Sequence, residues 1–193
     1  ALIDLRTLGR VLIPLLLVFG ACCLVALLMD KGFDRKRLWS WRAMARDLPR
    51  VVLIFVGFGT LIGAFTAIFF PDRLFGFMIG NTRLWVMVMV LYPFFSVYPQ
   101  EVIYRAFFFR RYRDVFRTPW QMIAASGIAF GWAHIVLENW IAVGMCTVGG
   151  VLFGWTYHRT RSTLAASVEH ALYGDLIWTI GLGWFFYAGS VGS

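Results

Sequence analysis

Long apolar runs alternate with short polar and basic segments along the whole chain. A helix needs about 20 mainly apolar residues to cross a bilayer. Runs of about this length or longer cover residues 11–29, 51–70, 84–109, 119–137, 140–157 and 163–187. The pattern predicts an all-α fold, a polytopic transmembrane helical bundle of about six spans, with residues 1–193 forming a single membrane domain.

The overall composition agrees with a membrane environment. Hydrophobic residues make up 60% of the chain and aromatic residues 18%, and the mean hydropathy is +0.73, whereas soluble domains are about half apolar. The net charge of +8 would suggest nucleic acid in a soluble protein. Here the basic residues cluster between apolar runs, which favours membrane topology and anionic lipid at the basic face, and no nucleic-acid partner.

The distribution of basic residues predicts an orientation. The segment 30–50 carries seven Lys or Arg residues against three Asp, and such loops stay on the cytoplasmic side. The third and fifth runs also end in clusters of arginine, from Arg110 and from Arg159 onward. We therefore expect three cytoplasmic basic loops, both termini outside, and a multi-pass protein of the bacterial inner membrane.

Two charged residues interrupt the third apolar run. Glu101 and Arg105 are four positions apart, so they share one face of a helix and can pair. Charges at membrane depth are costly unless they pair or face a polar cavity, so they mark a candidate functional site. Pro99 suits the first turn of a helix, which would place Gln100 and Glu101 at a helix start, where free N–H groups favour an anion.

Other ionisable residues lie in the fourth and sixth runs: His134, Glu169, His170 and Asp175. Glu101 and the two histidines could hold a zinc ion with an open position for water. Alternatively, Glu101 could act as general base on water while His134 and His170 orient the water or bind the oxyanion. Both alternatives end in hydrolysis. Glu169 points about 100° away from His170 on a helix and is expected to make a separate polar contact.

Three pairs of glycines four residues apart predict close helix packing inside the bilayer. They are Gly59/Gly63, Gly127/Gly131 and Gly150/Gly154. Phe130 and residues 107–109 are likewise interpreted as packing residues.

Three short motifs in order carry a family resemblance. They are Gln100-Glu101 followed by Arg105, Phe130 followed four residues later by His134, and His170 in the last long helix. This order resembles the CPBP family of membrane proteins, which includes type II CAAX prenyl proteases and bacteriocin-processing or Abi proteins. The resemblance covers residues 84–187, which we therefore expect to form a CPBP-like catalytic core.

The resemblance implies an intramembrane peptidase in which Glu101, Arg105 and both histidines line a cavity open to one membrane face. Two positions depart from the family pattern. Gln100 stands where the family has a glutamate that is often given the role of activating water, and Gly174 stands where an Asn or Asp usually follows His170 by four residues. Asp175, the next residue, could orient His170 or close a buried pair.

The expected depth of His134 in the membrane differs from that of Glu101 and His170. At 1.5 Å per helical residue, Glu101 and His170 each lie about 13 Å from the basic end of their helix, whereas His134 lies about 24 Å from Arg117. A tilted helix, a later helix start, or a re-entrant turn at residues 138–139 is therefore needed to bring His134 to the other two.

The expected function is that of an intramembrane endopeptidase acting on a membrane-associated or lipid-modified protein, with zinc as a possible cofactor. A non-catalytic membrane partner or chaperone protein with the same fold is the alternative that Gln100 and Gly174 favour. A proton-coupled transporter would also use intramembrane Glu, His and Asp. No inverted repeat of the kind that many transporters show is visible in the sequence.

Overall fold

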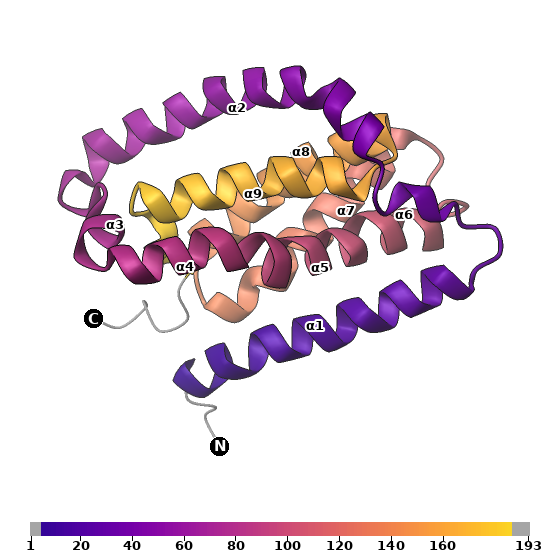
Figure 1. Ribbon diagram of the computed structural model, residues 1–193, viewed down its shortest axis with the longest axis horizontal. Coiled ribbons are helices and arrows are strands. Elements are labelled where there is room, and N and C mark those ends of the chain that lie inside the picture. The colour runs from indigo at the N-terminus through magenta and orange to yellow at the C-terminus, as the bar shows by residue number, and fades with distance from the viewer. Residues whose placement is uncertain (1–4, 187–193) are drawn as a thin grey trace.

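The computed structural model describes residues 5–186, with side chains from residue 11 onward. The described residues contain helices and no strand, which confirms the predicted all-α bundle (Figure 1). The α-helices are α1 Leu5–Met29, α2 Trp41–Phe69, α3 Gly76–Gly80, α4 Thr82–Tyr92, α5 Tyr98–Glu101, α6 Phe108–Arg111, α7 Pro119–Ala133, α8 Trp140–Thr160 and α9 Thr163–Thr179.

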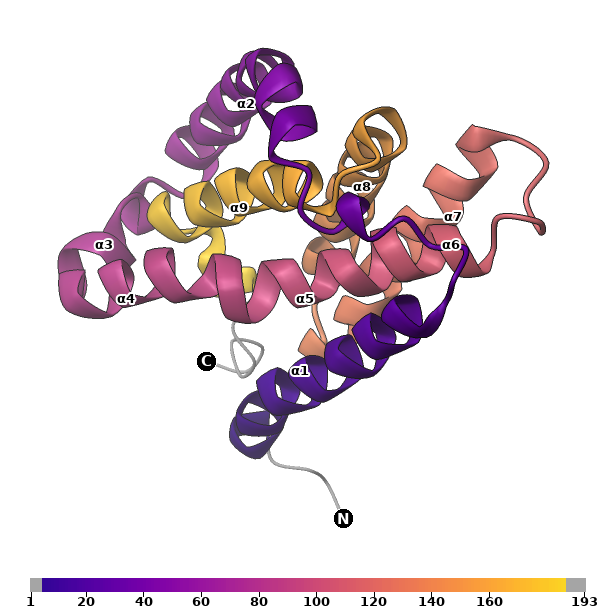
Figure 2. The ribbon, with the colours of Figure 1, turned by 45° about the vertical axis from the view of Figure 1, so that its right-hand side comes forward.

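Helix α9 occupies the centre of the bundle. It packs against α2 on one side, α8 on another and the α4–α5 segment on a third, as Figures 1 and 2 show from two directions. Helices α7 and α8 form an antiparallel pair behind it, and α1 lies along the outside of the segment that contains α5. Residues of α9 are therefore surrounded by protein, and polar side chains on this helix can meet partners from several directions.

Five helical segments among the described residues are long and apolar enough to cross a membrane. The predicted sixth span is shorter than expected, because α9 has 17 residues and its predicted end, Tyr187, lies outside the described residues. The predicted basic loop 30–50 is also shorter, because α2 begins at Trp41 and includes residues 41–50. A helix surrounded by other helices need not match the bilayer thickness by itself, which explains how α9 can be short.

Glycines bring α7 and α8 into close contact. A Cβ atom added at Gly150 would lie 2.9 Å from the Cα atom of Gly127, and one added at Gly131 would overlap Thr147. The predicted packing role is therefore confirmed for these glycines. It is wrong for Gly63, where an added Cβ would meet nothing within 4 Å. Gly63 lies on the long helix α2, which packs mainly on α9.

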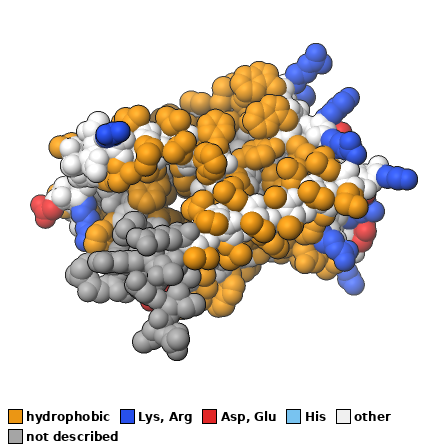
Figure 3. Space-filling view, turned by 60° about the horizontal axis from the view of Figure 1, so that its bottom comes forward, with side chains coloured by type: hydrophobic (Ala, Val, Ile, Leu, Met, Phe, Trp, Pro, Cys, Tyr) orange, Lys and Arg blue, Asp and Glu red, His pale blue; other side chains and the backbone are white. Residues whose placement is uncertain are grey.

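The outer surface of the bundle is largely apolar. Large hydrophobic side chains on α1, α2, α4 and α8 are exposed, including Phe58 and Val148. Figure 3 shows hydrophobic side chains over the middle of one face, with most of the visible Lys and Arg side chains gathered at one end. This distribution suits a protein whose sides contact lipid and whose ends contact water.

Candidate functional site

Glu101 lies within a continuous helical segment rather than at a helix start. The segment Thr82–Arg111 combines α4, α5 and α6 with π-helical stretches at Pro93–Val97 and Val102–Phe107. A proline inside an α-helix clashes with the carbonyl group four residues earlier, and the wider π-helical turn before Pro99 relieves this clash. The expected helix start at Pro99 is therefore wrong, and the charge of Glu101 must be balanced by side chains.

Arg105 supplies one of these side chains. Its Nε atom lies 3.1 Å from Oε2 of Glu101, and both side chains are 0% exposed. The Nη1 atom of Arg105 donates a 2.6 Å hydrogen bond to Ser126 on α7, and Ser126 donates in turn to the carbonyl of Tyr104. The guanidinium group also lies over the ring of Phe130, 5.2 Å from its centroid. Arg105 is thus fixed on several sides and neutralises Glu101.

His170 reaches Glu101 from α9. Its Nδ1 atom lies 2.9 Å from Oε1 of Glu101, so the carboxylate accepts a hydrogen bond from Nδ1–H. The imidazole stacks on Phe153 with ring centroids 4.6 Å apart and meets the edge of Phe130 at 5.4 Å. On its other side, Nε2 lies 3.3 Å from the hydroxyl of Tyr92. His170 is 6% exposed, so packing fixes both its position and its orientation.

His134 lies at the point where α7 ends and the chain turns back. A short 3-10 helix covers His134–Leu137, and Glu138 adopts a left-handed conformation that redirects the chain into α8. The Nδ1 atom of His134 lies 2.8 Å from the carbonyl oxygen of Phe130. Because a carbonyl can only accept, Nδ1 carries the hydrogen, and Nε2 of the neutral ring keeps a free lone pair.

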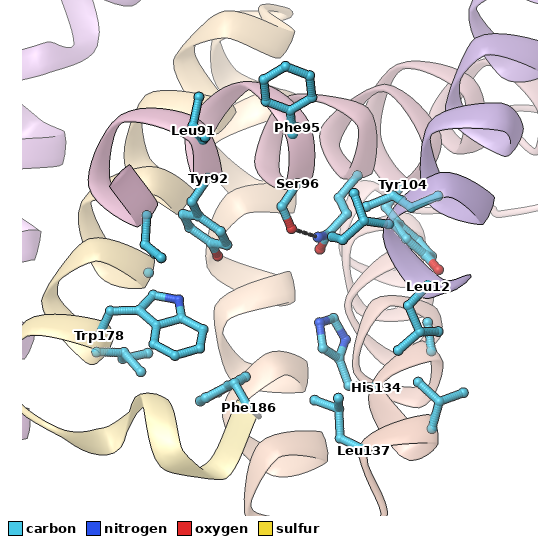
Figure 4. A pocket seen from close by; sticks show the side chains of 18 of the residues that line it. Leu12, Leu91, Tyr92, Phe95, Ser96, Tyr104, His134, Leu137, Trp178 and Phe186 are labelled. Carbon is cyan, nitrogen blue, oxygen red and sulfur yellow. Dashed lines mark hydrogen bonds between the residues drawn. The ribbon is translucent and has the colours of Figure 1, made fainter. Parts of the chain in front are cut away.

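A cavity of about 790 Å³ lies between α1, the α4–α5 segment, the turn after α7 and α9. Apolar side chains form most of its wall, and the polar groups among them include Tyr92, Ser96, Gln100 and His134. Figure 4 shows the imidazole of His134 pointing into the cavity toward the hydrogen bond between Ser96 and Gln100. In that 2.8 Å bond the Gln100 amide donates to Ser96.

The predicted site residues therefore fall into two groups. Glu101, Arg105 and His170 form a buried cluster, while Gln100 and His134 line the cavity. The residues of the buried cluster are not among those that line the cavity, and the ring of Phe130 contacts both histidine rings. Asp175 belongs to neither group, and its buried Oδ1 atom has no hydrogen-bond partner among the described residues.

The described residues do not fit the predicted zinc site. They include no group of three His, Cys, Asp or Glu side chains placed to share a metal ion. Both oxygens of Glu101 face cationic or hydrogen-bonding partners, Arg105 and His170. His134 is held at Nδ1 by a backbone carbonyl. The described residues present imidazole, amide and hydroxyl groups to the cavity instead.

Glu169 makes a separate contact, as expected from its position on the helix. It accepts a 2.5 Å hydrogen bond from Thr156, which is also bound by Arg50 of α2. Arg50 pairs with Asp47, and Asp47 also lies 3.8 Å from Arg159. This network joins α2, α8 and α9 and gives Oε2 of Glu169 a partner, whereas its buried Oε1 has none among the described residues.

Sequence reasoning missed three polar residues of the site. Ser126 holds Arg105, Ser96 holds Gln100, and Tyr92 contacts His170. The spacing of Ser96 and Gln100, four residues apart, was the available signal for one of these contacts. Ser126 and Tyr92 approach from other helices or over long sequence separations, and no local pattern distinguishes them from packing residues.

The fold and site define a helical membrane protein with a buried carboxylate–imidazole cluster beside a largely apolar cavity. Residues 81–174 match the family model described as type II CAAX prenyl endopeptidase Rce1-like. This match confirms the resemblance to the CPBP and CAAX proteases over residues 81–174. No curated protein and no solved structure matches the chain.

Proposed function

We propose that the protein is an intramembrane endopeptidase that hydrolyses a peptide bond of a membrane-associated or lipid-modified protein inside the cavity. The observation that supports this most directly is the free Nε2 of His134 on the wall of a largely apolar cavity. A cavity of about 790 Å³ is large enough for several residues or a lipid group. The matching family model is that of an endopeptidase, which supports the same class of reaction.

His134 is the proposed general base. Its Nε2 accepts a proton from a water molecule as the water oxygen bonds to the carbonyl carbon of the scissile peptide. The Nδ1–H bond to Phe130 keeps the ring in the tautomer that this step needs. The same proton then passes from Nε2 to the leaving nitrogen as the carbon–nitrogen bond breaks, so one imidazole serves as base and then acid. Gln100, on the opposite wall, orients the water.

Glu101 has a supporting role in this proposal. Its carboxylate is fully buried and faces His170 and Arg105 rather than the cavity. It holds the proton of His170 on Nδ1 and fixes the ring, as an acidic partner does for a catalytic histidine. This assignment gives the role of base to His134 in place of Glu101, the residue that the sequence alone suggested.

The test uses the full chain, purified in detergent or nanodiscs, with peptides that end in a farnesylated CAAX sequence and matched peptides without the lipid. We expect the wild-type protein to release the C-terminal residues, and we expect His134→Ala to reduce cleavage by at least about 100-fold. His158→Ala is the matched control, because His158 lies at the C-terminal end of α8 and away from the cavity wall. Equal cleavage by wild type and His134→Ala would rule out the proposed role of His134.

One observation favours a second function. Gln100, which cannot act as a base, lines the cavity where the family pattern has a glutamate. The protein would then be a non-catalytic membrane partner that binds another protein in the same cavity. In that case the wild-type chain would bind the peptides without cleaving them, and His134→Ala would leave binding unchanged.

A further inference from the structure

Tyr92 is the group that lies between the buried cluster and the cavity. It is the last residue of α4, directly before the π-helical stretch that begins at Pro93. Its hydroxyl lies 3.3 Å from Nε2 of His170, and its side chain lines the cavity, as Figure 4 shows. Glu101 and His170 are absent from the cavity wall. Among the described residues that line the cavity, Tyr92 is the one whose side chain lies within hydrogen-bond distance of this pair.

Gly174 provides the space that Tyr92 occupies. A Cβ atom added at Gly174 would overlap the ring and the hydroxyl of Tyr92. A side chain at position 174 and the observed position of Tyr92 therefore exclude each other. Gly174 follows His170 by four residues and lies one helical turn further along α9. The hydroxyl of Tyr92 thus stands where a polar side chain at position 174 would otherwise reach.

We propose that Tyr92 is a catalytic hydrogen-bond donor, which stabilises the oxyanion formed on the substrate carbonyl and takes the place of the side chain that Gly174 lacks. This inference rests on the proposed endopeptidase function. With Nδ1–H donated to Glu101, the ring offers Nε2 as the resting acceptor for the Tyr92 hydroxyl. When the oxyanion forms, the phenolic hydrogen turns from Nε2 to the negatively charged oxygen. No covalent bond changes at Tyr92 in this role.

Kinetics with Tyr92→Phe test this role. Removing one oxyanion donor lowers kcat by about 100-fold in well-studied hydrolases. We expect a loss of this size in kcat, with KM changed by less than about twofold, because the donor acts mainly in the transition state. Tyr98→Phe is the matched control, since Tyr98 also makes a 3.3 Å bond through its hydroxyl, but to the backbone of Leu38. An unchanged kcat in Tyr92→Phe, with an active wild type, would overturn the inference and leave the proposed function standing.

A second measurement does not depend on activity. Nitrogen NMR of histidine-labelled protein resolves three imidazoles, because the chain has three histidines. His170→Gln identifies the signals of His170, and we expect Tyr92→Phe to shift its Nε2 signal and Tyr98→Phe to leave it in place. No shift in Tyr92→Phe would overturn the pairing. If the wild-type protein cleaves no peptide, the proposed function and the catalytic role fail together, while this experiment still decides the pairing.

Exchange of the two side chains completes the test. Gly174→Asn alone should lower the Tm, because the new side chain overlaps Tyr92. In Tyr92→Ala/Gly174→Asn the space is free, and the new amide can reach His170. We expect the double variant to regain at least about tenfold in kcat over Tyr92→Ala, a gain that a purely structural role of Tyr92 does not predict. An equal kcat in Tyr92→Ala and Tyr92→Ala/Gly174→Asn would contradict the proposal that a side chain at position 174 can replace Tyr92.

Discussion

His170 lies with its Nδ1 atom 2.9 Å from Oε1 of Glu101, although 69 residues separate the two in sequence. The contact joins the central helix α9 to the helical segment Thr82–Arg111. Arg105 pairs with the other carboxylate oxygen of Glu101 and is itself bound to Ser126 on α7. The cluster therefore links three parts of the bundle, and its stability depends on every charge having a partner.

Glu101→Gln should destabilise the protein strongly. The amide has nearly the same shape as the carboxylate but leaves the buried charge of Arg105 without a counterion. Removing one partner of a buried pair costs about 3–5 kcal/mol, and we expect a loss of this order in the free energy of unfolding. Thermal and denaturant unfolding of the purified protein measure it. Glu138→Gln is the control, because Glu138 is exposed in the turn before α8.

A second substitution separates lost charge balance from lost packing. Arg105→Met removes the cation and keeps a long apolar side chain. We expect Glu101→Gln/Arg105→Met to be less destabilised than the sum of the two single variants, by about 1–3 kcal/mol. Additive effects would contradict the buried ion pair as the source of the loss.

Gln100→Glu should increase hydrolysis. The side chain lines the cavity and has no hydrogen-bond partner at Oε1 among the described residues, so a carboxylate there can act as a base. A positioned base typically contributes about 100-fold or more, and we expect at least about a tenfold gain in the cleavage rate of the farnesylated peptide.

Gln121→Glu is the matched control for this gain. Gln121 closes the capping box of α7, a position that glutamate also fills well, and it is absent from the cavity wall. A gain in both variants would point to a general charge effect. A decrease in Gln100→Glu would show that the site requires the neutral amide.

The sequence predicted the parts of the structure in which one physical requirement dominates. Apolar runs in lipid must form helices, and opposite charges four residues apart in an apolar helix are stabilised by pairing with each other. The helical bundle and the Glu101–Arg105 contact could therefore be predicted from the sequence. The Pro99 prediction failed because the π-helical turns on either side of α5 let the helix continue through a proline. The sixth predicted span, residues 163–187, is longer than α9. Apolar composition alone cannot distinguish a helix in lipid from a helix that is surrounded by protein.

Tyr92 illustrates why the rest of the site was not predictable. It stands in an apolar and aromatic run, where a tyrosine can equally well face lipid or pack. Its role depends on the ring of His170 and on the absence of a side chain at Gly174, both of which come from a distant part of the chain. Such a contact is visible only when the helices are assembled.

Gly150→Ala should destabilise the α7–α8 pair. The new methyl group would lie 2.9 Å from both Cα and O of Gly127, which are backbone atoms that cannot rotate away. Overpacking of this kind costs about 1–3 kcal/mol. Gly144→Ala on the same helix is the control, because an added Cβ there meets nothing within 4 Å. We expect it to raise stability by up to about 1 kcal/mol through helix propensity. Equal effects of the two substitutions on the Tm would contradict the close contact.

Asp30 should contribute a pH-dependent part of the stability. It follows α1 and accepts hydrogen bonds from Arg110 Nε at 2.5 Å and Arg110 Nη2 at 2.9 Å, and from the backbone of Gly32 at 2.8 Å. The bond from Arg110 is the main reason that the pKa of Asp30 falls to about 2, and the Gly32 bond adds to it. Folding therefore favours the ionised carboxylate.

The sign of this effect follows from the lowered pKa. The contribution is fully present above the ordinary pKa of an aspartate, 3.8, and disappears as the pH falls through about 2. We expect Asp30→Asn to have a lower Tm than wild type by a constant amount from pH 5 to 8, and the difference to shrink between pH 4 and pH 2. Asp72→Asn, which removes an exposed carboxylate from the segment between α2 and α3, controls for net charge. A difference that grows on acidification would contradict the pairing of Asp30 with Arg110.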